Sequence, residues 1–160
     1  MTTALEQRLR RLEDLEAIRD RDARYCRLLD EGAWAELVEL FTPDGVFDGL
    51  RRVQGHAELL PFYAGLAESG LSAFWHHVTN LEIAVEGDRA RTTSLLWQPC
   101  VVDDVPHVAA GRYTDELLRS GEEWRYRSRR VRFSYWAPLS EGWDRHRFAL
   151  ESARAAAVRP

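Results

Sequence analysis

Four side chains of this sequence combine the types and spacing that acid–base chemistry needs. Asp30 closes an apolar stretch with helical patterning, and Tyr25 precedes it by about one and a half turns. His76 and His77 stand side by side in a later stretch that reads as a strand. A histidine exchanges protons near neutral pH, and a carboxylate bound to one ring nitrogen leaves the other free to act as a base. The sequence therefore offers a carboxylate–imidazole pair, provided that the fold brings the two elements together.

The two histidines cannot both face the same side of a strand, because neighbouring side chains alternate. The apolar pattern over residues 81–85 places His77 on the buried face, and His76 with Asn80 on the other. A β-bulge between His76 and Asn80 would reverse this assignment, and strongly curved sheets commonly contain one. A buried histidine can also be an ordinary core residue, and Asp30 can be a solvated residue at a helix end, so both interpretations stay open.

Arginines form a second dense group of polar side chains. They crowd the last predicted strand, at Arg125, Arg127, Arg129, Arg130 and Arg132. Alternation sends most of them to solvent as a basic face and leaves at least one near the interior of the sheet. All 22 basic side chains of the chain are arginines, which excludes a lysine base or a lysine Schiff base.

One long helix has to position the tyrosine and the aspartate. Apolar residues recur there at three- and four-residue steps, with charges between them. This period predicts an amphipathic helix over about residues 4–30, which Gly32 ends. The same period predicts a short helix over residues 33–41, stopped by a turn at residues 42–45.

Two short strands and a third helix follow. Residues 45–48 and 51–54 read as a strand pair, and residues 56–68 carry apolar side chains on one helical face. Pro61 fits this helix only if it lies in the first turn, where its missing N–H would have no partner in any case.

Long strands then dominate the sequence. Two surround the turn at residues 86–88 and two more surround the turn at residues 120–122, which predicts an antiparallel meander. An amphipathic sheet and amphipathic helices bury their apolar faces against each other. We therefore expect a single cone-like α+β barrel domain of 160 residues, with its core over about residues 12–136. A closing segment over residues 137–160 should contain a C-terminal helix at residues 144–157.

Composition and missing motifs exclude several classes of function. The sequence has no glycine-rich phosphate loop, no GxSxG elbow, no HExxH and no Cys–His metal spacing, so we expect no metal and no organic cofactor. Cys26 and Cys100 read as reduced, partly buried thiols. The net charge of −4 is unfavourable for nucleic-acid binding. No apolar run is long enough for a membrane span, and the charged start is unlike a secretory signal, so a cytoplasmic location is expected.

Aromatic side chains could line a pocket under the helices. The candidate wall residues are Phe47, Phe62, Tyr63, Trp75, Trp97, Tyr113 and Phe133, with Trp34, Asn80 and His107 as further substrate contacts. Such a wall suits a hydrophobic, cyclic small molecule. The same aromatics are equally what the core of this fold requires.

Three segments in register resemble the SnoaL-like branch of the nuclear-transport-factor-two-like superfamily. They are AIRDRDARYCRLLDEGAWAELVELFTPDGVFDG, HHVTNLEIAVEGDRA and AAGRYTDELLRSGEEWRYRSRR, and together they span roughly residues 12–136. Each is weak alone, but their order is specific for the fold. Function is less constrained, because this fold hosts both enzymes and non-enzymes.

Within that superfamily the pattern is similar to the branch of scytalone dehydratase, hexachlorocyclohexane dehydrochlorinase and bile-acid dehydratase. The resemblance implies a cofactor-free Asp–His dyad, which falls on Asp30 and on His76 in an HxxxN segment with Asn80. It also implies roles for Tyr25 and for Arg129, which could hold an anionic oxygen or the leaving group. The resemblance favours His76 over His77, and it therefore requires the bulge.

The leading hypothesis is a lyase or isomerase, most readily a dehydratase, that removes a proton from a cyclic, carbonyl-bearing molecule. A polyketide-type cyclase or an epoxide-opening enzyme would need two pocket acids bridged by an arginine, and Asp115, facing Arg129, is the extra candidate. A non-catalytic module, like the small subunits of dioxygenases, would leave Asp30 and His76 unbonded. The second pocket histidine of scytalone dehydratase has no secure match, although His107 lies on a nearby strand. A homodimer or homotrimer is expected.

Overall fold

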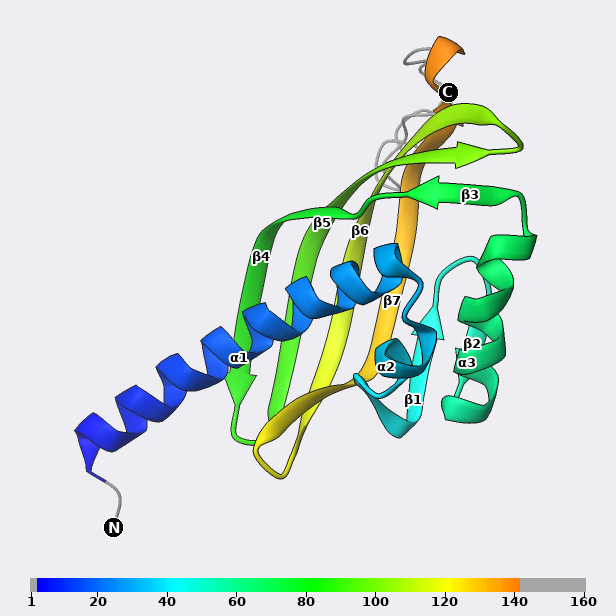
Figure 1. The fold of residues 1–160 in the computed structure, drawn as a ribbon. Coiled ribbons are helices and arrows are strands. Elements are labelled where there is room, and N and C mark those ends of the chain that lie inside the picture. Colours follow the sequence, from blue (N-terminus) through cyan, green and yellow to red (C-terminus); the bar gives the residue numbers. More distant parts are fainter. Residues whose placement is uncertain (1–2, 142–160) are drawn as a thin grey trace, which may run out of the picture.

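A layer of helices lies across one face of a strongly curved sheet in the computed structural model, which describes residues 3–141 (Figure 1). The predicted C-terminal helix at residues 144–157 lies outside the described residues. The sheet wraps partly around the helices, as expected for a cone-like α+β fold. The space between helices and sheet holds the hydrophobic core.

Helix α1 (Ala4–Glu31) is the long helix that the apolar period predicts. A capping box between Thr3 and Glu6 starts it, and Gly32, at φ 71°, ends it in the left-handed conformation that glycine adopts without strain. Only the second half of α1 covers the sheet; the first half extends past the edge (Figure 1), which leaves Leu5 and Leu9 exposed. The covered half carries the tyrosine and the aspartate of interest.

The second helix is shorter than predicted and the expected turn is absent. Helix α2 (Trp34–Val38) stops early, and strand β1 (Phe41–Asp48) already begins at Phe41. The turn residues 42–45 instead form an irregular stretch inside β1, where the register with the neighbouring strand shifts. At Gly45, a Cβ atom would lie 2.9 Å from Phe41 and from two backbone oxygens, so close backbone approach explains the glycine that looked like a turn signal.

Helix α3 (His56–Ala64) begins where predicted and continues as a 3₁₀ turn, η1 (Gly65–Glu68). Pro61 lies inside α3, beyond its first turn, so the expected first-turn position was wrong. A short helix tolerates this because only one intrahelical hydrogen bond depends on the missing N–H.

The sheet orders its strands as β2-β1-β7-β6-β5-β3, with β4 also paired to β5. The remaining strands are β2 (Arg52–Gln54), β3 (Leu71–Phe74), β4 (His77–Glu86), β5 (Arg89–Val102), β6 (Val105–Ser120) and β7 (Glu123–Pro138), followed by the 3₁₀ turn η2 (Leu139–Glu141). Strands β4 to β7 form the predicted antiparallel meander. Strand β1 runs parallel to β7, so the sheet is mixed and not wholly antiparallel. A parallel pair needs a long connection between its strands, and residues 49–122 supply it here.

A β-bulge in β4 decides which histidine faces the helices. Thr79 pairs with Leu95 and Glu82 with Thr93, so β4 carries one extra residue at this point. Asn80 lies there with φ 54°, a left-handed conformation that asparagine tolerates better than most residues. The extra residue inverts the alternation, so that His76 joins the inward set of positions 78, 81, 83 and 85, and His77 is exposed.

The core is rich in tyrosine and leucine from both layers. Cys26 and Cys100 are buried and unpaired, and burial raises the pKa of the Cys26 thiol to about 12, as expected for an unreactive thiol. Between residues 3 and 141, no helix combines the length and the apolar character needed to cross a bilayer.

Candidate active site

Asp30 and His76 meet at the end of α1. The imidazole Nδ1 lies 2.6 Å from Asp30 Oδ1, and the backbone N–H of His76 donates to both oxygens of the same carboxylate at 3.2 and 3.0 Å. The His76 side chain is 5 % exposed and that of Asp30 is 23 % exposed. Asp30 keeps its contact with solvent through an open groove between α1 and β4. The carboxylate therefore fixes both the ring and the chain to which the ring is attached.

The contact with Asp30 determines which ring nitrogen can act. A carboxylate accepts hydrogen bonds, so Nδ1 carries the proton that it donates to Asp30, and Nε2 is left with its lone pair. No residue between 3 and 141 forms a hydrogen bond with Nε2. The ring lines a cavity under the helices and meets Phe74 edge-on, with 5.5 Å between ring centroids. His76 thus keeps an unpaired basic nitrogen and lies in the wall of an apolar cavity.

The cavity is lined almost wholly by apolar side chains. Its lining comprises Tyr25, Leu29, Phe47, Leu50, Phe62, Tyr63, Leu66, Leu71, Phe74, His76, Gln98, Tyr113, Val131, Phe133 and Trp136. Its volume is about 40 Å³, which is room for a few water molecules. Leu50 is 57 % exposed and forms part of the rim. A ring-sized ligand would have to displace side chains at this rim.

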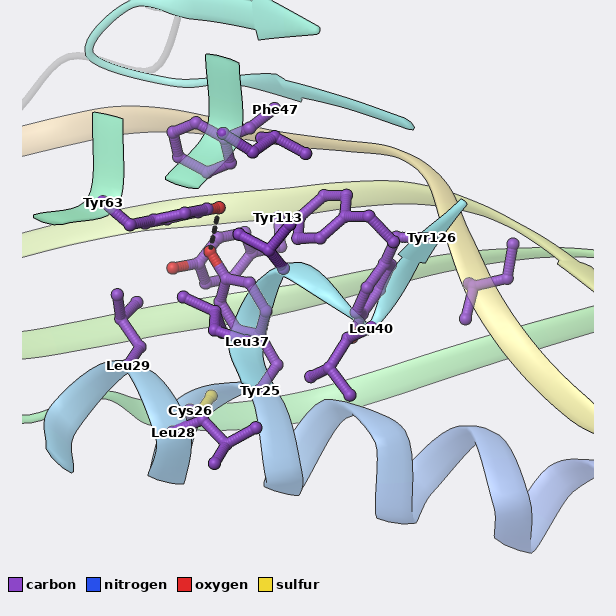
Figure 2. Packing of buried hydrophobic residues seen from close by; sticks show 14 of the residues in the cluster. Tyr25, Cys26, Leu28, Leu29, Leu37, Leu40, Phe47, Tyr63, Tyr113 and Tyr126 are labelled. Carbon is purple, nitrogen blue, oxygen red and sulfur yellow. Dashed lines mark hydrogen bonds between the residues drawn. The ribbon is translucent and has the colours of Figure 1, made fainter. Parts of the chain in front are cut away.

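Two tyrosines place a linked pair of hydroxyls in this wall. Tyr25 on α1 and Tyr63 on α3 lie with their hydroxyl oxygens 3.1 Å apart, and Figure 2 shows the two rings pointing toward one another from opposite helices. Burial raises the pKa of both phenols. Both therefore stay neutral at ordinary pH and act as hydrogen-bond donors rather than as acids.

Arg129 lies behind this wall and not in it. Its side chain is fully buried, and its guanidinium carbon lies 4.0 Å from the ring centroids of Tyr25 and Tyr113. Two of its nitrogens donate to Asp22 at 2.9 Å, and one also donates to the Tyr126 hydroxyl. Arg129 does not line the cavity. The expectation that it holds an anionic oxygen of a substrate is therefore not met by this geometry.

Asp115 completes the surroundings of Arg129. Its Oδ2 lies 3.6 Å from a guanidinium nitrogen and accepts a hydrogen bond from Thr92 at 3.0 Å. Burial raises the pKa of Asp115 to about 7, although the charge of Arg129 opposes the shift. For Arg129 itself, burial lowers the pKa, but the neighbouring negative charges outweigh it and raise the pKa overall. The Arg129 guanidinium thus lies between two carboxylates. Asp115 is fully buried, and Asp22 also reaches the open groove between α1 and β4.

The structure divides the predicted substrate contacts into two groups. Phe47, Phe62 and Tyr113 line the cavity, as do Tyr63 and Phe133. Trp34, Trp75, Asn80, Trp97 and His107 do not line it.

Each of these five residues has a structural reason for lying elsewhere. Trp75 lies between β3 and β4 and is 53 % exposed, and Trp97 is 41 % exposed at an outward position of β5. Asn80 is the exposed residue of the bulge. His107 bonds the backbone oxygen of Val105 at 2.7 Å, and Trp34 packs beside Gly32 at the end of α1.

Two polar residues of these sites were not predicted. Asp22 lies on the buried face of α1, two turns before Asp30, and its charged type suggested a solvated position. Gln98 is 4 % exposed in β5 and lines the cavity. A signal for Gln98 existed, since it shares the inward alternation of Leu96 and Cys100.

Comparison with known proteins agrees with this architecture. The model of the SnoaL-like domain family matches residues 10–130. A protein from Novosphingobium aromaticivorans, provisionally named as a scytalone dehydratase, superposes with a TM-score of 0.73 at 19 % identity, covering 81 % of this chain and 89 % of that one. Hexachlorocyclohexane dehydrochlorinase LinA-type3 from Novosphingobium barchaimii gives 0.75 at 21 % identity, with 82 % and 94 % covered.

An NTF2-like protein with a cystatin-like fold, from Novosphingobium aromaticivorans, gives a TM-score of 0.67 at 26 % identity, with 97 % of each chain covered. The comparison with curated proteins gives no match. The fold and site define a curved sheet covered by helices, with an apolar cavity under the helices. The chain belongs to the SnoaL-like domain family, since the family model matches most of its length.

Proposed function

We propose that this protein is a cofactor-independent lyase that removes water from a cyclic, hydrophobic β-hydroxy ketone. The observation that carries the proposal is the 2.6 Å contact between Asp30 and His76 Nδ1, which leaves Nε2 unpaired at the wall of an apolar cavity. A neutral imidazole in this tautomer is a competent general base near neutral pH. The dehydratase and dehydrochlorinase names among the structural neighbours support the same class of reaction.

The reaction begins with removal of a proton from the carbon next to the carbonyl. Nε2 of His76 takes this proton, the C–H electron pair forms a carbon–carbon double bond, and the carbonyl oxygen becomes an enolate. Asp30 stabilises the imidazolium that results, because its negative charge lies against Nδ1–H. The enolate oxygen then re-forms the carbonyl double bond. The electron pair of the enolate carbon–carbon double bond becomes a new double bond between the α-carbon and the β-carbon, and the bond from the β-carbon to the hydroxyl oxygen breaks.

The departing hydroxyl needs a proton to leave as water. The imidazolium of His76 holds the proton just removed and can return it, so the step balances without another acid. Tyr25 is unsuited to full proton transfer because burial raises its pKa. Its hydroxyl, linked to that of Tyr63, instead donates a hydrogen bond to an oxygen of the substrate.

An epoxide-opening function is the second candidate, because the Arg129 cluster contains two acids and one arginine. Asp22 and Asp115 flank one guanidinium, which is the arrangement that such an enzyme requires. The cluster lies behind Tyr25 and Tyr113, however, and Arg129 does not line the cavity. A non-catalytic module is disfavoured as well, since it should leave Asp30 and His76 unbonded.

Turnover of 3-hydroxy-1-tetralone tests the proposal. Loss of water from this β-hydroxy ketone gives a dienone that tautomerises to 1-naphthol, whose fluorescence reports the rate. Asp30→Asn and His76→Ala should each lower kcat by about 10²–10⁴-fold. His77→Ala is the matched control, because the adjacent ring is exposed, and it should retain the wild-type rate. Equal rates in the wild type, Asp30→Asn and His76→Ala would remove the dyad from the mechanism.

A further inference from the structure

Gln98 is a polar side chain of the cavity that the mechanism above does not use. It is 4 % exposed, and it lines the cavity beside apolar neighbours. Within residues 3–141 its amide forms no hydrogen bond. Water in the cavity can satisfy this amide in the free protein. A ligand that displaces this water has to supply a hydrogen-bond partner for the amide.

The sheet register places Gln98 beside the base. His77 pairs with Trp97 on the neighbouring strand, and Phe74 pairs with Cys100. Between these pairs, the backbone N–H of Trp75 donates to the backbone oxygen of Pro99 at 3.1 Å. This unbroken register sets His76 directly opposite Gln98. Side chains at directly opposed positions lie about 4.5–5.5 Å apart at their Cβ atoms, and both of these side chains face the cavity.

This spacing fits the two reacting atoms of an enolisable ketone. The carbon that loses its proton and the carbonyl oxygen beside it are separated by a single carbon. A base and a hydrogen-bond donor on adjacent strands can therefore reach both atoms at once. The amide N–H₂ of a glutamine is such a donor, and it carries no charge that would need compensation in an apolar cavity.

We propose that Gln98 holds the carbonyl oxygen of the substrate while His76 Nε2 removes the proton from the adjacent carbon. The inference rests on the proposed function and deepens it. As the C–H bond breaks, negative charge moves onto this oxygen, and the amide N–H stabilises it where it develops. The substrate class is then a neutral cyclic ketone. Chlorinated hydrocarbons without a carbonyl group would leave the amide unpaired, and they are disfavoured for this reason.

Hydrogen exchange at C2 of 1-tetralone isolates this step. The ketone has no leaving group, so proton abstraction in D₂O appears only as deuterium uptake, which NMR measures. Gln98→Met keeps an unbranched side chain of similar length and removes the donor. It should slow exchange by about 10²–10³-fold, the effect of losing one donor to a developing oxyanion. Gln54→Met, at an exposed position of β2, is the matched control and should exchange at the wild-type rate.

The infrared carbonyl stretch of bound 1-tetralone provides a readout that does not depend on turnover. A hydrogen bond from Gln98 should shift the band to lower frequency in the wild type and in His76→Ala, and Gln98→Met should abolish the shift. Wild-type exchange in Gln98→Met, or an unchanged band in that variant, would overturn the inference. If the wild type binds 1-tetralone with a shifted band but exchanges no hydrogen, the proposed lyase activity fails and the role of Gln98 in binding stands.

Discussion

Two of the aspartates that helix α1 presents to the sheet, Asp22 and Asp30, lie about two turns apart, and their surroundings differ in one decisive respect. Asp22 meets Arg129, whose side chain is fully buried and stacked between tyrosine rings. Asp30 meets His76, whose second nitrogen remains unpaired at a cavity wall. Both are carboxylates paired with a basic group from the sheet side. Of the two pairs, only the Asp30 pair has a ring nitrogen that can accept a proton and a side chain in the wall of the apolar cavity.

The difference shows that an ion pair does not by itself mark an active site. An arginine cannot give up its proton in a protein, and a buried guanidinium between two acids stabilises chiefly by avoiding the cost of unpaired charge. A histidine that donates from one ring nitrogen to a carboxylate keeps a lone pair on the other ring nitrogen, and this lone pair can accept a proton. The Arg129 cluster is therefore a structural support, and it holds Tyr25 in the wall of the site that the Asp30 pair serves.

The largest expected effect that separates the two regions is on stability. Arg129→Met should lower the free energy of unfolding by about 3–5 kcal/mol, because it leaves two buried carboxylates without a counter-charge. Denaturant unfolding followed by circular dichroism measures this change. Arg130→Met removes an exposed arginine that pairs with Asp48, and it should cost no more than about 1 kcal/mol. Similar losses in the two variants would contradict the assignment.

The second prediction compares the same substitution at the two aspartates, Asp22 and Asp30. Asp22→Asn should lower the free energy of unfolding by about 1.5–3 kcal/mol, the range for hydrogen bonds to charged groups. Its dehydration rate should stay within about tenfold of the wild type, because Asp22 contributes no atom to the cavity wall. Asp30→Asn should show the reverse pattern, a small loss of stability and a loss of turnover of at least about 10²-fold. Parallel unfolding and rate measurements on both variants decide the matter.

The pH dependence of stability provides a third separation. Burial raises the pKa of Asp115 to about 7, above its unfolded value, so its protonated form is favoured on folding. The contribution of this group to stability is therefore complete at low pH and is lost as the pH rises from about 4 to 7. Relative to Asp115→Asn, the wild type should lose up to about 1.4 kcal/mol per pH unit over this window. A constant difference between the two proteins across pH would show that Asp115 titrates normally.

The smallest expected effect concerns the bulge, which sets the orientation of His76 and does not involve Arg129. Asn80→Gly should change the free energy of unfolding by no more than about 0.5–1 kcal/mol, because glycine adopts the left-handed conformation at least as readily. Asn80→Val should cost about 1–2 kcal/mol, since a β-branched residue is strained there, and it should lower turnover by displacing His76. Thermal unfolding and the naphthol assay measure the two effects. Unchanged turnover in Asn80→Val would mean that the bulge does not fix the base.

Periodicity in the sequence was sufficient for most of the architecture. The three- and four-residue period of α1 and the long alternating strands around Gly87 and Gly121 fix the layers, because each pattern can bury its apolar face in only one way. The prediction of a turn at residues 42–45 was wrong, because Gly45 allows close backbone packing inside a strand. A turn signal and a packing signal use the same residue type, and only the neighbours distinguish them.

The site was less predictable because its residues depend on contacts between distant elements. Alternation alone assigned the wrong histidine to the cavity, and only the resemblance to known dehydratases indicated the bulge. Trp75 and Trp97 were chosen for their aromatic type although both side chains are exposed. Arg129 was expected to touch a substrate, but nothing in its sequence neighbourhood reveals Asp22, the partner that holds it behind the wall.

The extra residue at Asn80 has a consequence for how this fold can change over evolutionary time. In a strand, odd-numbered side chains face one side of the sheet and even-numbered side chains face the other. A single inserted residue exchanges the two faces for all side chains on one side of the insertion. A deletion at this position would replace the ring at His76 with the ring at His77 without altering any codon for histidine. Insertions and deletions at one point of a strand can therefore rewrite the lining of the cavity more drastically than substitutions do. Transplanting the Asp30–His76 pair into another member of the family would require copying the inserted residue together with the two side chains.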